Sequence, residues 1–271
     1  MNNNPIGIFD SGIGGLTVAN AISKAMPKES LVYFGDTAHL PYGEKSKDLI
    51  REYSLGISKF LLEVKHCKAI VIACNTASAA AYEYLRDSHK GSYPIINVID
   101  PIIEALVERP ELNKIGLIAT NTTISSGVYQ EKIRRRKPSA SINTLATPLL
   151  VPMIEEGYAN DNISRTLIGN YLSNEALEGI EALILGCTHY PIIRKEIEEY
   201  YEQQVQLFDS TDILANKLKW ILEKEDLLCS ERSAPNSFYI SDMNPHFAKS
   251  AERFFQESIN LELLNIWKEG Q

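Results

Sequence analysis

Short, largely apolar runs recur along the chain and are separated by longer stretches in which apolar and polar residues mix. Most of these runs lack the apolar/polar alternation of a half-exposed sheet, so they predict strands that are covered on both faces. We expect such strands at Ile6–Phe9, Leu31–Phe34, Ala69–Ala73, Ile95–Ile99, Ile115–Ala119, Ala182–Leu185, Val205–Phe208 and Phe238–Ile240.

The stretches between the runs repeat their apolar residues with the period of a helix that has one buried face. Leu49–Val64 places Ile50 and Ile57 on one face, and Asp212–Leu222 repeats the pattern. Strands that alternate with helices predict an α/β fold with doubly wound, mostly parallel sheets. In this fold class ligands bind beyond the carboxyl ends of the strands, so candidate chemistry is expected there.

A weak internal repeat divides the chain. Ile6–Ser11 resembles Ile115–Thr120, and Ala69–Thr76 resembles Ala182–His189. The two matches occur in the same order and at a similar offset, which favours a duplicated unit over chance. We therefore expect two similar doubly wound domains that face a central cleft. The expected domains are residues 1–98 plus 210–271, and residues 99–209.

The second repeated motif ends in a cysteine in each half. Cys74 and Cys187 both follow a buried strand, where a neighbouring helix N-terminus would favour the thiolate form. Each cysteine alone is equally well explained as a small buried apolar residue. A matched pair on opposite sides of one cleft suits a reaction that removes a proton from one face of a carbon and delivers one to the other. Cys67 and Cys229 have no counterpart, and we interpret them as structural.

Two loops after the first two expected strands are candidate binding loops. Asp10–Gly15 is rich in glycine, which permits tight turns and leaves backbone N–H groups available to an anion. It does not match the Gly-x-Gly-x-x-Gly pattern of dinucleotide sites, and Asp10 serves equally well as a helix cap. Asp36–Gly43 places proline and glycine around an aromatic residue, which is typical of a shaped turn with or without a ligand.

Composition excludes several classes of protein. Of the 271 residues, 44% are hydrophobic and 23% are charged, and the formal net charge is −8. These values exclude a disordered chain, and the longest unbroken apolar run, Ala69–Cys74, is far too short to cross a membrane. The acidic balance argues against nucleic acid binding, so we interpret the basic cluster Lys132–Lys137 as a solvated helix end.

The N-terminal residues and the cysteines point to the cytoplasm. The start of the chain has neither the basic nor the apolar region of a signal peptide. The four cysteines form no Cys-x-x-Cys pair, and Cys187 and His189 lack the usual spacing of zinc ligands. We therefore expect a cytoplasmic protein with free thiols and no metal site.

Four motifs, in order along the chain, resemble those of the glutamate racemases, which belong to the cofactor-independent aspartate/glutamate racemase superfamily. The motifs are Phe9–Leu16, Asp36–Gly43, Ala73–Ser78 and Leu185–Pro191. The resemblance extends to the late strand Phe238–Asp242 and covers nearly the whole chain. It implies an enzyme that interconverts L- and D-glutamate without a cofactor and supplies D-glutamate for peptidoglycan synthesis.

The resemblance also implies roles for individual residues. Cys74 and Cys187 match the two acid/base thiols, with Cys187 as the base and Cys74 as the acid when L-glutamate is converted. Asp10 and His189 match residues that assist the thiols, and Glu155 matches an acid near the second cysteine. The positions expected to bind substrate are Asp10, Ser11, Pro41, Tyr42, Gly43, Asn75, Thr76, Thr120, Thr188 and His189.

Some expectations remain open at this level. Thr122 and His39-Leu40 depart from the residues that are common in the family, which affects the expected fine contacts with substrate. We expect a homodimer that binds glutamate as its small-molecule substrate. Some family members are linked to inhibition of DNA gyrase, and the basic cluster Lys132–Lys137 leaves such a role open as a minor alternative. A racemase or isomerase of the same superfamily that acts on aspartate or a hydantoin is one alternative. A non-catalytic ligand-binding regulatory protein is another.

Overall fold

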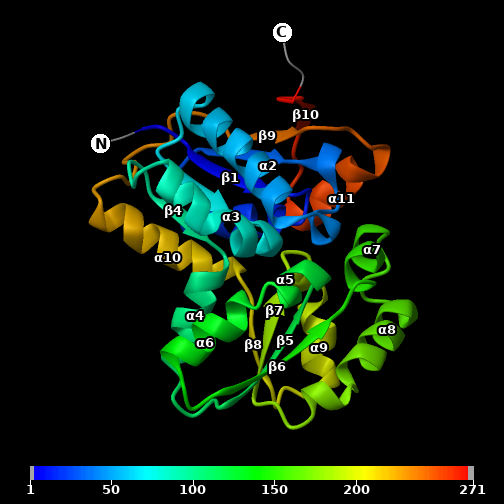
Figure 1. The fold of residues 1–271 in the computed structure, drawn as a ribbon. Helices are drawn as coiled ribbons and strands as arrows, with labels where there is room; N and C mark the ends of the chain where they lie inside the picture. The colour runs from blue at the N-terminus through cyan, green and yellow to red at the C-terminus, as the bar shows by residue number, and fades with distance from the viewer. Residues whose placement is uncertain (1–2, 268–271) are drawn as a thin grey trace.

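Two parallel sheets, one above the other in Figure 1, form the framework of the molecule. The computed structural model describes residues 3–267, apart from the side chains of residues 245, 246 and 248. The first sheet has the order β10-β9-β2-β1-β3-β4 and the second has the order β6-β5-β7-β8, with parallel pairing throughout. The strands are β1 (Ile6–Asp10), β2 (Leu31–Gly35), β3 (Ala69–Ile72), β4 (Ile95–Asn97), β5 (Lys114–Ala119), β6 (Ser141–Ala146), β7 (Ala182–Gly186), β8 (Gln206–Phe208), β9 (Ser237–Ile240) and β10 (Leu261–Leu263).

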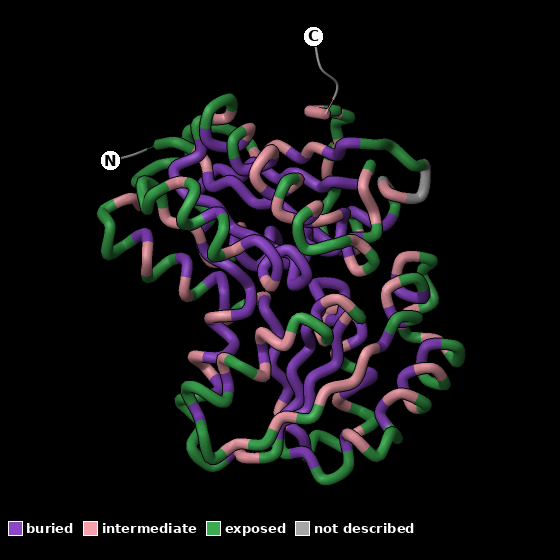
Figure 2. Tube along the Cα trace, viewed as in Figure 1, coloured by how far each residue is buried: buried purple, intermediate pink, exposed green. Residues whose placement is uncertain are grey.

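Helices cover the faces of both sheets, which explains why the central strands lack polar positions. Every residue of β1, β2, β3 and β7 is buried, and Figure 2 shows the interior of both sheets as buried. The predicted α/β class with two sheets is therefore confirmed. The helices are α1 (Leu16–Ala25), α2 (Lys47–Lys59), α3 (Asn75–Ser88), α4 (Ile99–Val107), α5 (Asn121–Ser125), α6 (Val128–Arg136), α7 (Leu150–Glu155), α8 (Asn162–Leu172), α9 (Arg194–Tyr200), α10 (Thr211–Lys224) and α11 (Pro245–Phe255).

The four strands of the second sheet correspond in order to four of the six strands of the first sheet, which agrees with the internal repeat. The order β2-β1-β3-β4 in the first sheet matches β6-β5-β7-β8 in the second. The first sheet takes its strands from both ends of the chain, whereas the second takes them from the middle. The division into residues 1–98 plus 210–271 and residues 99–209 stays a prediction.

Two expected elements differ from the structure, and two strands of the structure were not expected. The strand expected at Ile95–Ile99 ends at Asn97, because the Asn97 side chain accepts hydrogen bonds from the N–H groups of Ile99 (2.8 Å) and Asp100 (2.9 Å) and so begins α4. The helix expected over Leu49–Val64 is α-helical only to Lys59 and then forms a π-helical turn. The edge strands β6 and β10 were not predicted, since their residues are mostly half-buried or exposed and lack an apolar run.

Within residues 3–267, no helix has both the length and the apolar character needed to span a membrane.

A close contact between the end of β2 and the loop after β1 allows the packing of the first sheet to be tested. A Cβ atom on Gly35 would lie 2.1 Å from the Gly12 carbonyl oxygen, which is backbone and has little freedom to move. We expect Gly35→Ala to lower the free energy of unfolding by about 3 kcal/mol. Gly169→Ala is the control, because the nearest atom to a Cβ there is 3.9 Å away and alanine favours a helix. Chemical denaturation should show a large loss for the first variant only; equal stability of the two would contradict the packing.

Candidate functional site

A cavity of about 350 Å³ lies where the carboxyl ends of the two sheets meet. Its volume falls in the range of roughly 300–1,000 Å³ that is typical of small-molecule sites. Loops from both sheets line it, as expected for α/β proteins. The predicted site residues that line it are Ser11, Pro41, Tyr42, Gly43, Cys74, Asn75, Thr76, Thr120, Glu155, Cys187, Thr188 and His189.

Asp10 is the one predicted site residue that does not line the cavity. Its Oδ2 atom accepts hydrogen bonds from the backbone N–H groups of Gly12 (3.0 Å) and Gly15 (3.1 Å), beneath the glycine-rich loop. The carboxyl group is almost fully buried, and this burial raises its pKa. Asp10 therefore holds the conformation of the loop before α1 without lining the cavity itself.

Cys74 lies between the end of β3 and the first turn of α3. Its sulfur accepts a hydrogen bond from the Ala77 N–H (3.4 Å), and its S–H group donates to the Ser11 hydroxyl (3.6 Å). Burial and then the negative charge of Asp10 raise the pKa of the Cys74 thiol to about 12. At neutral pH Cys74 is consequently a protonated thiol, which is a proton donor.

Cys187 follows β7 and has a different electrostatic environment. Its sulfur lies 3.7 Å from Nδ1 of His189, whose Nε2 lies 2.9 Å from Oε1 of Glu155. Burial by itself would lower the pKa of His189, but hydrogen bonds and charge interactions with Cys187 and Glu155 raise it to about 10. At neutral pH an imidazolium therefore adjoins the Cys187 sulfur.

Contacts across the cavity connect the two thiol sites. Gly14 packs against the His189 side chain so closely that a Cβ atom on Gly14 would lie 2.3 Å from the imidazole ring. The Thr17 hydroxyl, on α1, donates to the carbonyl oxygen of Thr188 (2.9 Å). The loop after β1 thus holds the loop after β7 in place.

The polar groups on the cavity wall suit an anionic ligand. Asn75 accepts a hydrogen bond from the Tyr129 hydroxyl at Oδ1 (2.7 Å), while its buried Nδ2 group has no protein acceptor among the described residues. The hydroxyl groups of Thr76 and Thr120 lie 3.1 Å apart beside it. No Lys or Arg is found among the described residues that line the cavity. A bound carboxylate would depend on amide, hydroxyl and backbone donors, with α3 beginning at the cavity.

The Tyr42 hydroxyl is bonded to a buried carboxylate. It donates to Oδ2 of buried Asp36 (2.7 Å), and the same carboxylate accepts from Ser241 and Trp267. Asp36 therefore shapes the loop that carries Pro41 and Gly43 on the cavity wall. The sequence indicated this loop but not the function of Asp36 as its anchor.

Several lining residues were not predicted. Thr147 and Pro148 follow β6, and Val151 and Pro152 belong to α7 close behind. The missing signal was β6 itself: once a strand is placed at Ser141–Ala146, the residues at its carboxyl end become candidates. Among the residues that the structure describes, no cluster of three or more His, Cys, Asp or Glu side chains could hold a metal ion.

Comparison with known proteins adds the family. The Asp/Glu/Hydantoin racemase model matches residues 15–218, about three quarters of the chain. The chain belongs to this family. It is 40% identical over 264 residues to a glutamate racemase of Neisseria meningitidis serogroup C, covering 97% of each chain. The structure is similar to that of the Francisella tularensis glutamate racemase in complex with D-glutamate, with a TM-score of 0.90, 37% identity, and coverage of 98% of this chain and 99% of that one.

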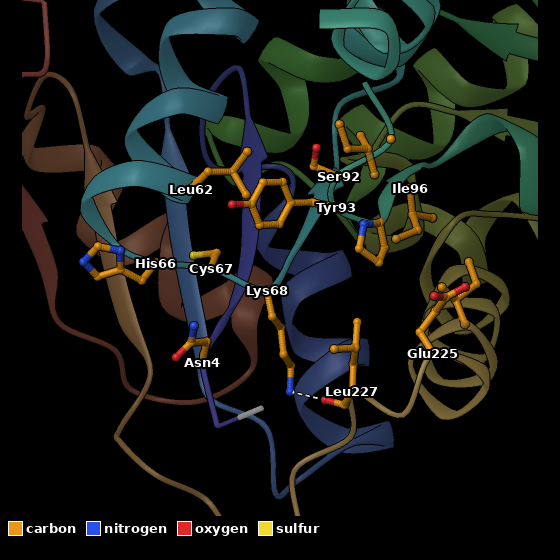
Figure 3. Close-up of a pocket in the computed structure, with 14 residues that line it drawn as sticks. Asn4, Leu62, His66, Cys67, Lys68, Ser92, Tyr93, Ile96, Glu225 and Leu227 are labelled. Atoms are coloured by element: carbon orange, nitrogen blue, oxygen red, sulfur yellow. Dashed lines mark hydrogen bonds between the residues drawn. The ribbon is translucent and has the colours of Figure 1, made fainter. Parts of the chain in front are cut away.

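The remaining cysteines lie away from the racemase-like cavity. Cys67 precedes β3, at the opposite end of that strand from Cys74, and borders a second cavity of about 620 Å³ that Figure 3 shows. In the same region the Lys68 ammonium group donates to the Leu227 carbonyl oxygen (2.6 Å) and lies 3.2 Å from the Cys229 sulfur. The structure thus separates the two matched cysteines from Cys67 and Cys229.

The imidazolium state of His189 can be measured directly. We expect NMR titration of the imidazole nitrogens to show His189 protonated at neutral pH and titrating near pH 10, because Glu155 and Cys187 stabilise the cation. Glu155→Gln removes the carboxylate 2.9 Å away and should lower this pKa. Glu156→Gln changes an exposed neighbour and serves as the control. A His189 that titrates near 6.5 in all three proteins would contradict the assigned pair.

Proposed function

We propose that this protein interconverts L- and D-glutamate by proton transfer between the α-carbon and two cysteines, Cys74 and Cys187. The observation that supports this most strongly is the matched placement of these cysteines at the ends of β3 and β7, on one cavity and in contrasting electrostatic environments. The similarity to glutamate racemases over nearly the whole chain supports the choice of glutamate.

The contrast between the two thiols supports a direction for each proton transfer. In the conversion of L-glutamate, Cys187 acts as the base, because the His189 imidazolium beside it stabilises a negatively charged sulfur. Cys74 acts as the acid, because its raised pKa keeps the proton on sulfur until the opposite face of the carbon needs it. The reverse conversion exchanges the two roles.

The charge that develops on the substrate needs stabilisation without a cofactor. Loss of the α-proton places negative charge on the α-carboxylate, where it can be stabilised by fixed hydrogen-bond donors in a site that excludes water. The unpartnered Nδ2 group of Asn75 and the first turn of α3 are donors of this kind. Thr76, Thr120 and Thr188 would provide further hydroxyl and backbone contacts.

Asp10 and Glu155 act on the thiols through different neighbours. The buried Asp10 carboxyl raises the pKa of Cys74, so a negative charge there favours the donor form of this thiol. Glu155 contacts His189 and so stabilises the cation beside Cys187. Neither group needs to touch the α-carbon for these effects.

The wider setting follows from the family resemblance. The product D-glutamate would serve peptidoglycan synthesis, and the enzyme would work as a homodimer in the cytoplasm, where thiols stay reduced. A disulfide or oxidised sulfur at either cysteine would remove the proton carrier. Sedimentation analysis would test the dimer.

Racemisation in heavy water tests the use of two separate proton carriers. We expect deuterium in the newly formed enantiomer and almost none in the starting enantiomer recovered at early times, because the base and the donor are different thiols. Mass spectrometry after chiral separation makes the measurement. Equal labelling of both enantiomers would contradict the proposal, and binding of glutamate without any exchange would indicate a non-catalytic protein. Aspartate and hydantoins, tested in parallel, decide the substrate class.

Substitution of single cysteines separates catalytic from structural thiols. We expect Cys74→Ser and Cys187→Ser each to lower the racemisation rate by at least about a hundredfold, because serine is a far weaker acid than cysteine. Cys229→Ser is the matched control, since its sulfur contacts Lys68 and not the cavity. Circular dichroism should show that all three fold. Racemisation at the normal rate by either cavity variant would show that its thiol is not needed.

A further inference from the structure

The C-terminal helix α11 holds the element that carries Glu155. The Arg253 guanidinium donates to the Ile154 carbonyl oxygen (3.1 Å), and the Ser250 hydroxyl donates to the Glu155 carbonyl oxygen (3.2 Å). Ile154 and Glu155 are the last residues of α7, whose terminal carbonyl groups lack helical partners. In Figure 1, α11 belongs to the upper half of the molecule and α7 to the lower half. These contacts therefore connect the two halves at the cavity.

The chain after α7 is shaped to admit the guanidinium group. Gly157 has a φ of +89°, which favours glycine, and its N–H group also donates to the Ile154 carbonyl (3.1 Å). A Cβ atom on Gly157 would lie 3.1 Å from one Arg253 nitrogen and 3.2 Å from the other. Arg253 thus packs over a turn that a larger residue would fill. A positive charge at the C-terminal end of a helix is also electrostatically favourable.

The same helix contacts His189 directly. Phe254, which is fully buried, packs against the imidazole ring with the ring centroids 5.2 Å apart and the planes at 82°. Helix α11 consequently contacts both members of the Glu155–His189 pair. Ser250 contacts the backbone of Glu155, and Phe254 contacts the ring of His189. The titratable groups that interact with His189 are Glu155, Cys187 and Asp10.

We propose that α11 is the positioning element for proton transfer at Cys187, and that Arg253 is its main positioning residue. This inference depends on the proposed function. Arg253 holds the C-terminal end of α7 in place, and this end carries the Glu155 carboxylate. The carboxylate in turn orients the His189 ring beside the Cys187 sulfur and stabilises its protonated form. Arg253 reaches no lining position of the cavity, so it acts through Glu155 and does not contact substrate.

The test compares Arg253→Met with the conservative Arg253→Lys in the full-length protein. Iodoacetamide alkylation, followed by peptide mass spectrometry, reports the reactivity of Cys187 and Cys74 separately. For Arg253→Met we expect alkylation of Cys187 to slow by about tenfold relative to Cys74, and kcat to fall by about tenfold or more while KM changes by less than about threefold. The NMR-measured pKa of His189 should fall as well. Arg253→Lys should restore much of each value.

Two further variants keep the test decisive if Arg253→Met does not fold. Ser250→Ala removes one small hydroxyl group and should shift the His189 pKa and the Cys187 reactivity in the same direction by a smaller factor. Lys249→Met, on the exposed side of the same helix, should change neither. If folded Arg253→Met and Ser250→Ala keep the wild-type reactivity of Cys187 and the wild-type His189 pKa, the proposal is wrong. Alkylation and NMR need no turnover, so they test the positioning role of α11 separately from the racemase reaction. A wild-type protein that fails to racemise glutamate would overturn the proposed function, whereas unchanged Cys187 reactivity and His189 pKa in the variants would overturn the role of α11.

Discussion

The contact between the glycine-rich loop after β1 and the His189 ring is the constraint on which the site depends. Gly14 leaves no room for a side chain against the imidazole, and the Thr17 hydroxyl, in the first turn of α1, donates to the Thr188 carbonyl oxygen. The loop itself is shaped by the buried carboxylate of Asp10. Through this contact the first sheet determines where the second sheet presents Cys187. These contacts hold the end of β1 and the end of β7 close to one another, beside the cavity that both thiols line.

The two cavity thiols are chemically identical and equally buried, but their ionisable neighbours differ. The Asp10 carboxyl group near Cys74 raises the pKa of this thiol further than burial alone. Cys187 has a histidine whose own carboxylate partner keeps it positively charged. In water these interactions would be weak, whereas in a site shielded from solvent they are much stronger. The contrast arises from neighbours distant in sequence, such as Glu155 for His189.

Local sequence signals predicted most of the framework and failed where tertiary contacts or edges decide. Apolar runs located the buried strands because covered strands cannot afford polar positions. The half-exposed strands β6 and β10 carry no such signal. Because β6 was not predicted, Thr147, which follows it and lines the cavity, was not predicted as a site residue either. The end of β4 depended on one side chain, Asn97, which caps α4 and overrides the apolar pattern. The family motifs indicated the cavity loops, yet they placed Asp10 on the cavity, whereas it lies beneath.

By itself the sequence determined the α/β class, the internal repeat and the pairing of Cys74 with Cys187, because hydrophobic periodicity and repeated motifs are local properties of the chain. Only the tertiary structure decided which ionisable groups lie near these thiols: Asp10 for Cys74, and the His189–Glu155 pair for Cys187. It also brought α11, from the far end of the chain, against the end of α7. Electrostatic effects depend on distances between side chains in space, and no pattern along the sequence records those distances.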